Sequence, residues 1–569
     1  MVEGRHLSRL SPAAALLVLS ACASACLGQS GTYRAVWADA FSVGFKSNQQ
    51  INDLVSRAVT GNYNLILAEV LAFHDTGASG HGAYWNSSIV PRAGDISGNI
   101  DPLGTLVALA HANGLEVDAW IVPYRVSSVW PPAGNALLAA HPEWLMVPQA
   151  AMGDGPATVG GYYTLDPGSP DTQEYLVSIV RELVSNYEID GLNLDYIRYV
   201  QTDAGYPADE NYPYSTLARF QALTGYPGVP PPTGVTSWND FRRRTIDEFV
   251  RRLRAEIPSI ANPREPLRLS ADLIAFGDAP SDFTNSDAYR LHQNWRMWMQ
   301  SGWLDLGIPM NYKREYNSQQ RQWYRNWVNA MVLWRYQRHM ACGQANYLNT
   351  MADSVTQLQY ALNAGLNGTS NFSYDATADQ NRDGTPETDW TWYTYVSNNL
   401  FTSPTAIPSM PWRDAATASE GTLWGRVVDD STGLPVDGAI VQVGALAPVE
   451  TDGNGHYVVT LIPAAAGGTS YTVTADSLAC DTASAEATVL RGQVVRLDID
   501  LCAVDPPAGP GDMDQDGDID LDDLGLFLFC MQGPGAAYPP GHLCLNGDAD
   551  SNQSVDMADL ASFQVAFGQ

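Results

Sequence analysis

The chain of 569 residues is too long for one ordinary domain, and its 45% hydrophobic content is typical of a globular protein with a large core. Its 62 acidic residues exceed its 31 Lys and Arg, so the formal net charge is −31. This balance argues against nucleic acid and anionic membrane surfaces as partners, and it suits a chain that binds cations such as calcium.

Residues 1–28 have the pattern of a signal peptide. "RHLSRL" supplies positive charge, "AAALLVLSACASACLG" is a short apolar core, and small residues follow. The apolar run is too short for a permanent transmembrane span. "LSAC" at 19–22 also resembles a bacterial lipoprotein box, in which Cys22 would carry the lipid. Both interpretations predict a chain outside the cytoplasm: secreted, periplasmic, or held at the cell surface.

Residues 31–400 alternate short apolar runs with helix-like segments. Eight such units predict an α/β fold, a (β/α)8 TIM barrel with enlarged loops. A doubly wound sheet is the alternative, and the lack of a Gly-rich phosphate loop after the first strand disfavours it. The eight strands are expected to begin at Tyr33, Tyr63, Leu115, Asp190, Leu267, Leu304, His339 and Gly365.

Helical periodicity is clearest in two of the intervening segments. "NQQINDLVSRAVTGNYN" places Ile51, Leu54, Val55 and Ala58 on one face, which predicts a helix that buries these side chains. "WNDFRRRTIDEFVRRLRAEI", from Trp238, predicts a long amphipathic helix with its arginines on the solvent-exposed face.

The composition and the hydrophobic pattern of the sequence change after residue 400. Residues 401–420 are rich in Pro, Ser and Ala and are interpreted as a linker. Residues 421–502 show short alternating strands without a helix, which predicts a small antiparallel β-sandwich. Residues 503–511 are a second linker, and 512–569 form a separate acidic module. The sandwich resembles regulatory-like and collagen-adhesin B-type modules, which implies a spacer or accessory role.

Cysteine usage agrees with export. The pairs Cys480/Cys502 and Cys530/Cys544 are close in sequence, which favours disulfides in an oxidising compartment. Reduced core residues are the alternative. Cys342 falls in a predicted buried strand and is interpreted as a free, small core residue.

The acidic module contains two twelve-residue segments, "DMDQDGDIDLDD" and "DADSNQSVDMAD", 36 residues apart. Oxygen-bearing residues at positions one, three, five, seven, nine and twelve are typical of a helix-flanked Ca²⁺ loop, as in an EF-hand. Gln553 replaces the turn glycine of the first loop, Gly517, so the second site is expected to be weaker. A solvated acidic tail is the alternative. The candidate ligands are Asp512, Asp514, Asp516, Asp518, Asp520 and Asp523, then Asp548, Asp550, Asn552, Ser554, Asp556 and Asp559.

These duplicated segments resemble a type I dockerin. The resemblance implies bound calcium and a cohesin-like protein partner. The spacing of the two loops and the insert with Cys530 and Cys544 depart from the pattern of cellulosomal dockerins.

The stretch "DGLNLDYIRY", from Asp190, places an acid at the end of an apolar run. Strand alternation points Asn193 and Asp195 into the barrel, and it points Leu192 and Leu194 towards the outer helices. Active sites of TIM barrels lie at the C-terminal ends of the strands. Asp195 is therefore predicted to lie at the mouth of the barrel.

Other predicted strands and the loops after them carry acids and aromatic residues. Aromatic faces stack on sugar rings, and two carboxyl groups can perform the acid and nucleophile steps of glycoside hydrolysis. Glu69 and Asp272 are the candidates for the general acid that would act with Asp195. The expected substrate-binding residues are Asp118, Trp120, Tyr124, Arg125, Asn193, Asn311 and Tyr312.

A run of motifs resembles the glycosidase-like family ten barrels: "RAVWADAF", "NLILAEV", "DPLGTLVALAHANGLEVDAWIVPYR", "HPEWL" and "TLDPGSPDTQEYLVSIVRELVSNYEIDGLNLDYIRY". The resemblance covers residues 31–400 and implies a TIM barrel that acts on glycan strands of the cell wall, with Asp195 as the leading catalytic residue. Two positions depart from the family pattern, Glu69 in "EVL" and Asp118 in "VDAW". Glu69 is slightly preferred as the acid because this chain differs there.

The sequence therefore predicts a secreted glycoside hydrolase of a polysaccharide, and cell-wall glycan is the substrate that the resemblance implies. The alternative is a non-catalytic glycan-binding or scaffold-attached barrel. A metal hydrolase is disfavoured because the nine His form no paired ligand motif in the barrel, so no catalytic cofactor is expected.

Overall fold

The computed structural model describes residues 31–76, 81–227, 230–477, 480–502, 511–513, 519, 521–531, 537–539 and 542–566. The predicted signal peptide with Cys22, most of the second linker, and the candidate ligands Asp514, Asp516, Asp518 and Asp520 lie outside these residues. Among the described residues, no helix has the length and hydrophobicity needed to cross a membrane.

Eight parallel strands close into a barrel, so the TIM-barrel prediction is confirmed and the doubly wound alternative is wrong. Hydrogen bonds link the strands in the order β1-β12-β11-β10-β9-β7-β3-β2, and β2 pairs with β1 to close the circle. The strands are β1 (Tyr33–Ala38), β2 (Leu65–Leu71), β3 (Glu116–Ile121), β7 (Gly191–Leu194), β9 (Arg268–Ile274), β10 (Leu306–Met310), β11 (His339–Ala345) and β12 (Gly368–Phe372).

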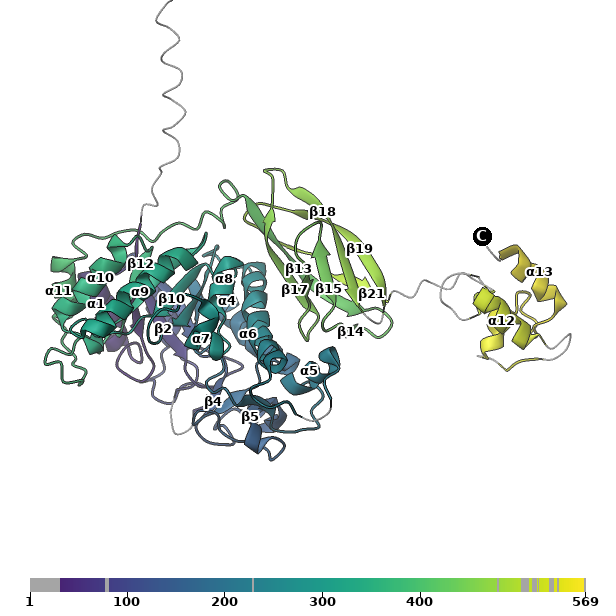
Figure 1. The fold of residues 1–569 in the computed structure, drawn as a ribbon, viewed down its shortest axis with the longest axis horizontal. Coiled ribbons are helices and arrows are strands. Elements are labelled where there is room, and N and C mark those ends of the chain that lie inside the picture. The colour runs from purple at the N-terminus through teal and green to yellow at the C-terminus, as the bar shows by residue number, and fades with distance from the viewer. Residues whose placement is uncertain are drawn as a thin grey trace, which may run out of the picture. The chain divides into compact units, whose positions relative to one another are not determined.

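Helices surround the barrel, as α1, α9 and α10 show in Figure 1. Helix α1 begins after Ser47, whose side chain accepts a hydrogen bond from the Gln50 amide, and it buries the four apolar residues that the sequence predicts. The helices of this unit are α1 (Asn48–Thr60), α2 (Pro102–Ala112), α3 (Ala136–Ala140), α4 (Pro170–Asn186), α5 (Thr216–Thr224), α6 (Thr236–Glu256), α7 (Asp287–Arg290), α8 (Trp295–Gln300), α9 (Ser318–Trp334), α10 (Met351–Asn363) and α11 (Trp392–Asn399).

Helix α6 differs from its prediction, because most of its arginines are buried. The Arg242 and Arg252 side chains are among the largest fully buried ones, and the Arg254 guanidinium lies 2.7 Å from the Asp305 carboxylate. The Arg243 guanidinium lies over the Tyr289 ring, 3.6 Å from its centroid. These guanidinium groups form ion pairs with acids and cation–π contacts with rings of other elements. Helical periodicity carries no information about such partners.

A second, four-stranded sheet that the sequence did not reveal is inserted after β3 and β7. It has the order β4-β6-β5-β8 and antiparallel pairing. Its strands are β4 (Arg125–Ser127), β5 (Leu145–Pro148), β6 (Tyr163–Leu165) and β8 (Ala204–Pro207). Because β4 follows β3 closely, this sheet holds Arg125 beside the C-terminal end of the barrel.

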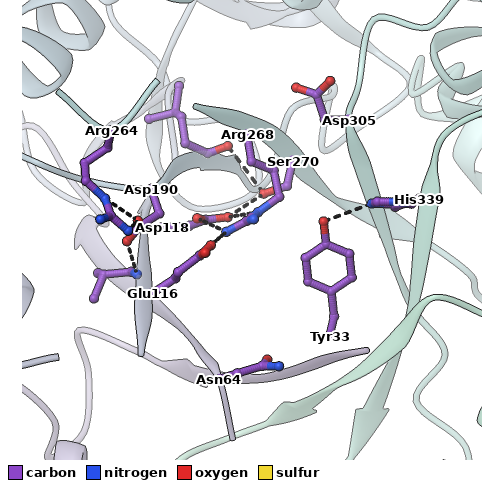
Figure 2. A network of polar contacts seen from close by, with 12 residues as sticks. Tyr33, Asn64, Glu116, Asp118, Asp190, Arg264, Arg268, Ser270, Asp305 and His339 are labelled. Atoms are coloured by element: carbon purple, nitrogen blue, oxygen red, sulfur yellow. Dashed lines mark hydrogen bonds and ion pairs between the residues drawn. The ribbon is translucent and has the colours of Figure 1, made fainter. Parts of the chain in front are cut away.

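An ion-pair network fills the N-terminal end of the barrel. Figure 2 shows Arg268 reaching to Asp118 and Glu116, at N···O distances of 2.8 and 2.9 Å. On the opposite wall, the Tyr33 hydroxyl lies 3.0 Å from Nδ1 of His339. A Cβ at Gly191 would lie 2.5 Å from the Asp118 carboxylate, so only glycine leaves room for this pair.

Residues 401–420 are packed against the same end of the barrel, which corrects their interpretation as a linker. The Trp412 indole donates to Asp305 Oδ1 at 2.6 Å, and the Arg413 guanidinium donates to both Asp305 oxygens. Arg338 pairs with Glu420 at 2.6 Å. The segment was interpreted as a linker because Pro, Ser and Ala dominate its composition, and the few side chains that anchor it do not change that composition. We call this segment the base strap.

The second compact unit contains a β-sandwich with its own apolar core. Strand β13 pairs with β20 and β21 in parallel, so this sheet is mixed and not purely antiparallel as predicted. The other sheet, β16-β15-β18-β19, is antiparallel. The strands are β13 (Glu420–Asp429), β14 (Leu434–Pro435), β15 (Ile440–Val443), β16 (Val449–Glu450), β17 (His456–Pro463), β18 (Thr469–Ser477), β19 (Cys480–Val489), β20 (Val494–Arg496) and β21 (Ile499–Leu501).

The C-terminal residues of this unit form helices α12 (Leu521–Cys530) and α13 (Met557–Ala566). The predicted Cys530–Cys544 disulfide is confirmed, and Cys342 is free and buried in β11, as predicted. Cys502 is also disulfide-bonded, while its predicted partner, Cys480, has a side chain outside the described part of the chain.

Candidate active site

A cavity of about 340 Å³ lies where the barrel strands end, and it contains all three predicted catalytic carboxyl groups. These residues lie on or just after three barrel strands, β2, β7 and β9, of which β7 and β9 are neighbours. The cavity is lined by Trp37, Asp39, Phe41, Glu69, Trp120, Arg125, Asp195, Tyr196, Asp272, Met310, Tyr312 and Phe372.

Asp195 follows the last residue of β7, and its backbone amide donates to the Ile121 carbonyl of β3. Leu192 and Leu194 are buried in the core outside the barrel, which confirms the predicted alternation. The Asp195 carboxylate accepts a 2.6 Å hydrogen bond from the Tyr196 amide. Burial raises its pKa, while the positive charge of Arg198 and the Tyr196 hydrogen bond act in the opposite direction.

Asp272 lies on β9, the strand next to β7. The register pairs Leu194 with Ala271, which places Asp195 level with Asp272 on the neighbouring strand. Both oxygens of Asp272 accept hydrogen bonds, from Trp37 Nε1 at 3.1 Å and Asn193 Nδ2 at 3.3 Å. Burial, followed by the negative charge of Asp195, raises the pKa of Asp272 well above its usual value.

Glu69 and Asp39 form a second group of carboxyls. The register pairs Ala38 with Ala68, so Asp39 follows β1 level with Glu69 on β2. Glu69 accepts a 2.8 Å hydrogen bond from the Ala40 amide. Burial raises the pKa of Glu69 to about 8, and the charges of Asp39 and Asp195 act in the same direction. Burial also raises the pKa of Asp39.

Asp39 was not among the predicted site residues. The signal was present in the sequence, because Asp39 follows the first strand as Asp195 follows the fourth. Trp37, Phe41, Tyr196, Met310 and Phe372 were also missed, and their roles depend on which side of each strand or loop faces the cavity.

Aromatic rings form much of the cavity wall. Tyr312 and Phe372 lie with ring centroids 5.7 Å apart, and Trp37 meets Tyr312 edge-on at 6.4 Å. Arg125 is held between rings, with its guanidinium 4.4 Å from the Tyr196 centroid and 5.3 Å from that of Phe73. The predicted placement of Trp120, Arg125 and Tyr312 beside the acids agrees with the structure.

Four predicted substrate-binding residues do not line the cavity. Asp118 lies towards the N-terminal end of the barrel, away from the cavity, because it is early in β3 and pairs with Arg268. Tyr124 is buried against Phe249, with ring centroids 5.9 Å apart. The Asn311 amide donates to the Tyr324 carbonyl at 3.0 Å. Asn193 points inward as predicted but contacts Asp272, so it supports a cavity residue.

The second calcium-like loop brings three carboxylates together. Oxygens of Asp548, Asp550 and Asp559 lie within 4.8 Å of one another, a spacing that fits one Ca²⁺ with ligands at about 2.4 Å. The Ala549 amide donates to Asp559 Oδ1 at 2.9 Å. The carboxylate of one further predicted ligand, Asp556, is not part of this group.

The first loop shows the same internal hydrogen bond. There the Met513 amide donates to Asp523 Oδ1 at 2.5 Å, from position two to position twelve. The described parts of both loops therefore share this hydrogen bond between positions two and twelve, and their hard oxygen donors suit Ca²⁺.

A family model described as glycosyl hydrolase-like 10 matches residues 32–362, which is more than half of the chain. The chain belongs to the glycosyl hydrolase-like 10 family. A second model, described as a carboxypeptidase regulatory-like domain, matches residues 422–502 and agrees with the regulatory-like resemblance of the sandwich. The dockerin-like interpretation of residues 512–569 stays a prediction.

The curated relatives of this family member include the glycosyl hydrolase DigH of Escherichia coli K12, which is 29% identical over 254 residues, 40% of this chain and 52% of DigH. The glycosyl hydrolase YngK of Bacillus subtilis is 22% identical over 352 residues, 58% of this chain and 62% of YngK. The chain thus spans about half to three fifths of the length of these relatives. Among solved structures, a β-galactosidase from Halorubrum lacusprofundi has a TM-score of 0.44 at 12% identity, over 70% of this chain and 60% of that one.

Proposed function

We propose that this protein hydrolyses glycosidic bonds of a polysaccharide in the cavity at the C-terminal end of its barrel. The observation that carries the proposal is the placement of Asp195 and Asp272 on adjacent strands, inside a cavity with aromatic walls. Glycoside hydrolysis needs two carboxyl groups with different protonation states, and aromatic faces bind sugar rings.

The environments of the two carboxyls suggest their roles. Burial raises the pKa of Asp195, and Arg198 and the Tyr196 amide act against that rise, as expected of a carboxyl group that must ionise to serve as a nucleophile or to stabilise an oxocarbenium-like transition state. Burial and the Asp195 charge favour the protonated form of Asp272, as expected of a general acid. Glu69 is the second candidate for the acid, because its pKa is also raised, to about 8.

The names of the relatives support hydrolysis, and the family resemblance supports cell-wall glycan as the substrate. Export is proposed from the N-terminal pattern, with Cys22 as the residue that a lipid anchor would use. Calcium is proposed for the C-terminal loops, where it would join carboxylates that otherwise repel one another. We propose no metal for the hydrolytic step.

Reducing-end release from a panel of polysaccharides, including peptidoglycan glycan strands, tests the proposal. Asp195→Asn is expected to lower kcat by about 10³ or more with an unchanged melting temperature, because a charge essential to the transition state is lost. Asp287→Asn, an exposed acid outside the cavity, is the matched control. Glycan binding without turnover by the wild-type protein would support the alternative, a non-catalytic glycan-binding barrel.

A further inference from the structure

Phe41 is the most exposed ring in the cavity wall. It is 53% exposed, whereas the other rings of the lining are buried or partly buried. A single exposed apolar side chain elsewhere on a protein surface needs no explanation. Phe41, however, lines the same cavity as Asp195 and Asp272, so a ligand of that cavity is able to contact it.

Two neighbouring rings support Phe41 without stacking over it. The centroid of the Phe41 ring lies 4.6 Å from that of His81, at an interplanar angle of 61°, and 6.1 Å from that of Phe73, at 78°. Both are edge-type contacts, so they restrain the ring and leave the exposed part of its surface available. The electron-rich face of an aromatic ring attracts the weakly positive C–H groups of a sugar ring. Phe41 thus offers a sugar a preformed contact surface.

Asp39 and Glu69 hold the backbone that carries Phe41. Asp39 Oδ1 accepts from the Phe41 and Ser42 amides at 2.9 Å each. Glu69 Oε2 accepts from the Ala40 amide at 2.8 Å and so joins this loop to β2. Three successive backbone amides therefore depend on side chains of the cavity. Glycoside hydrolysis needs two carboxyl groups, and these hydrogen bonds give the other two a role.

The far end of the same loop is fixed to α1. The side-chain oxygen of Gln50 accepts from the Gly44 and Lys46 amides, at 3.3 and 2.9 Å. Side chains thus hold residues 39–46 at both ends, and Phe41 is exposed on a restrained backbone. A restrained ring binds a sugar at a lower cost in conformational entropy than a mobile one.

Phe41 and Asp272 lie on opposite sides of the mouth of the barrel. Phe41 follows β1, and Asp272 lies on β9. The hydrogen-bonded order of the strands places β1 and β9 opposite each other, because three strands separate them in either direction round the barrel. A glycan that contacts both Phe41 and Asp272 therefore crosses the cavity.

We infer that Phe41 is a sugar-binding platform, on which one residue of the glycan stacks while a different residue presents its glycosidic bond to Asp195 and Asp272. Glu69 is then a positioning residue, which acts on the glycan through the Ala40 amide and Phe41. The inference rests on the proposed function, because it concerns the same cavity. It names a contact that determines affinity for a chain of sugars, and it assigns no step of the reaction to Phe41.

Isothermal titration calorimetry on the Asp195→Asn protein tests the platform, with Asp272→Asn as the substitute if that variant does not fold. The probes are the hexamers of N-acetylglucosamine and of glucose. Adding Phe41→Ala should weaken binding of the tighter hexamer about tenfold, and adding Phe41→Trp should keep or increase the affinity. Unchanged affinity after Phe41→Ala, or binding of neither hexamer, would overturn the inference.

Tyr214→Ala is the matched control, because Tyr214 is 55% exposed and does not line the described cavity. It should change the affinity for the hexamer by less than about twofold, since a surface side chain outside the cavity contributes little. An equal loss of affinity in Tyr214→Ala and Phe41→Ala would show that the effect is not specific to the platform.

Kinetics locate the sugar that Phe41 contacts. In the otherwise unsubstituted protein, Phe41→Ala should raise KM for the hexamer more than KM for an aryl monoglycoside, whose single sugar occupies the side of the cavity at Asp195 and Asp272. The kcat for the hexamer should change less than KM, because the platform binds the ground state and the transition state alike. An equal rise in KM for both substrates would place Phe41 at the attacked sugar and overturn this part of the inference.

A double-mutant cycle tests the positioning role of Glu69. Glu69→Met removes the acceptor of the Ala40 amide and should weaken hexamer binding severalfold, whereas Glu69→Gln keeps an oxygen acceptor and should restore the affinity. In the Phe41→Ala background, Glu69→Met should cause no further loss, because its effect passes through Phe41. The same loss with and without the Phe41 ring would overturn the role of Glu69.

Asp39 provides the second comparison if Glu69→Met does not fold. Asp39→Ala removes the acceptor of the Phe41 and Ser42 amides, and Asp39→Asn keeps one. Hexamer binding should therefore weaken more in Asp39→Ala than in Asp39→Asn, and the difference should disappear in the Phe41→Ala background. A difference that persists there would overturn positioning of the platform by this loop.

The outcomes separate this inference from the proposed function. If the wild-type protein cleaves glycans and Phe41→Ala binds the hexamers as tightly as the protein with Phe41, the platform is wrong and the hydrolase proposal stands. If Phe41→Ala weakens binding but the wild-type protein cleaves no glycan, the platform stands and the hydrolase proposal fails.

Discussion

The guanidinium of Arg413 donates two hydrogen bonds to the carboxylate of Asp305, at 3.2 and 2.8 Å, and so joins the base strap to the start of a barrel strand. Asp305 is fully buried and also accepts from Arg254 and Trp412. Burial alone would raise the pKa of Asp305, but the charges of Arg413 and Arg254 hold it below its usual value. A segment with the composition of a linker therefore closes the N-terminal end of the barrel.

Arg413→Gln is predicted to lower the free energy of unfolding by about 3 kcal/mol, because it leaves a buried carboxylate with one fewer counter-charge. The folded pKa of Asp305 is depressed, so its stabilisation is complete above its unfolded pKa, about 3.9, and is lost as pH falls towards the folded value. The difference between wild type and variant should thus be constant from about pH 7 to 5. Urea denaturation followed by Trp fluorescence measures it.

The control for this experiment is Arg290→Gln, which removes an exposed ion pair with Asp287. Exposed pairs contribute under about 1 kcal/mol, so this variant should unfold close to wild type. Equal stability of the two variants would show that the base strap does not stabilise the barrel.

Asp272→Asn is predicted to lower kcat on oligosaccharides by about 10² to 10³, because the leaving oxygen would no longer be protonated. Activity on aryl glycosides with good leaving groups should be largely retained, since these need no proton. Glu69→Gln should show no such dependence on the leaving group. If Glu69→Gln instead loses activity on oligosaccharides but keeps activity on aryl glycosides, Glu69 would be the general acid.

Arg198→Gln is predicted to move the acidic limb of the pH–kcat/KM profile upward by about one unit or more. The Arg198 charge acts against the rise in the Asp195 pKa that burial causes, so removing it lets that pKa rise further. Activity that requires ionised Asp195 is then lost at a higher pH. Arg290→Gln should leave the acidic limb in place. An unshifted limb in Arg198→Gln would show that ionisation of Asp195 does not set the acidic limb of the profile.

Gln553→Gly is predicted to strengthen calcium binding by the second loop. Gln553 has φ 70°, in the left-handed region, where a non-glycine residue costs about 1 kcal/mol. Calorimetry should show one site with severalfold higher Ca²⁺ affinity, and Asp559→Ala should abolish that site. A chain that binds no Ca²⁺ would contradict the metal assignment altogether.

Periodicity proved most informative where a residue's environment repeats along the chain. The eight barrel strands, the buried face of α1 and the inward direction of Asn193 and Asp195 all follow from spacings of two or about 3.6 residues. The same rule failed for Asp118, because alternation gives the direction of a side chain but not its depth in the barrel. Asp118 lies in the layer that pairs with Gly191 and Arg268, below the cavity.

The sequence by itself determined the barrel, the sandwich and the candidate carboxyls at strand ends, because local spacing and apolar alternation encode them. Only the tertiary structure decided which charges meet. The Asp195–Asp272 and Asp39–Glu69 pairs arise from the registers of neighbouring strands, and the Asp305–Arg413 pair joins residues more than a hundred positions apart. The physical reason is that the free-energy cost of a buried charge depends on its partners, and closure of the barrel brings those partners together.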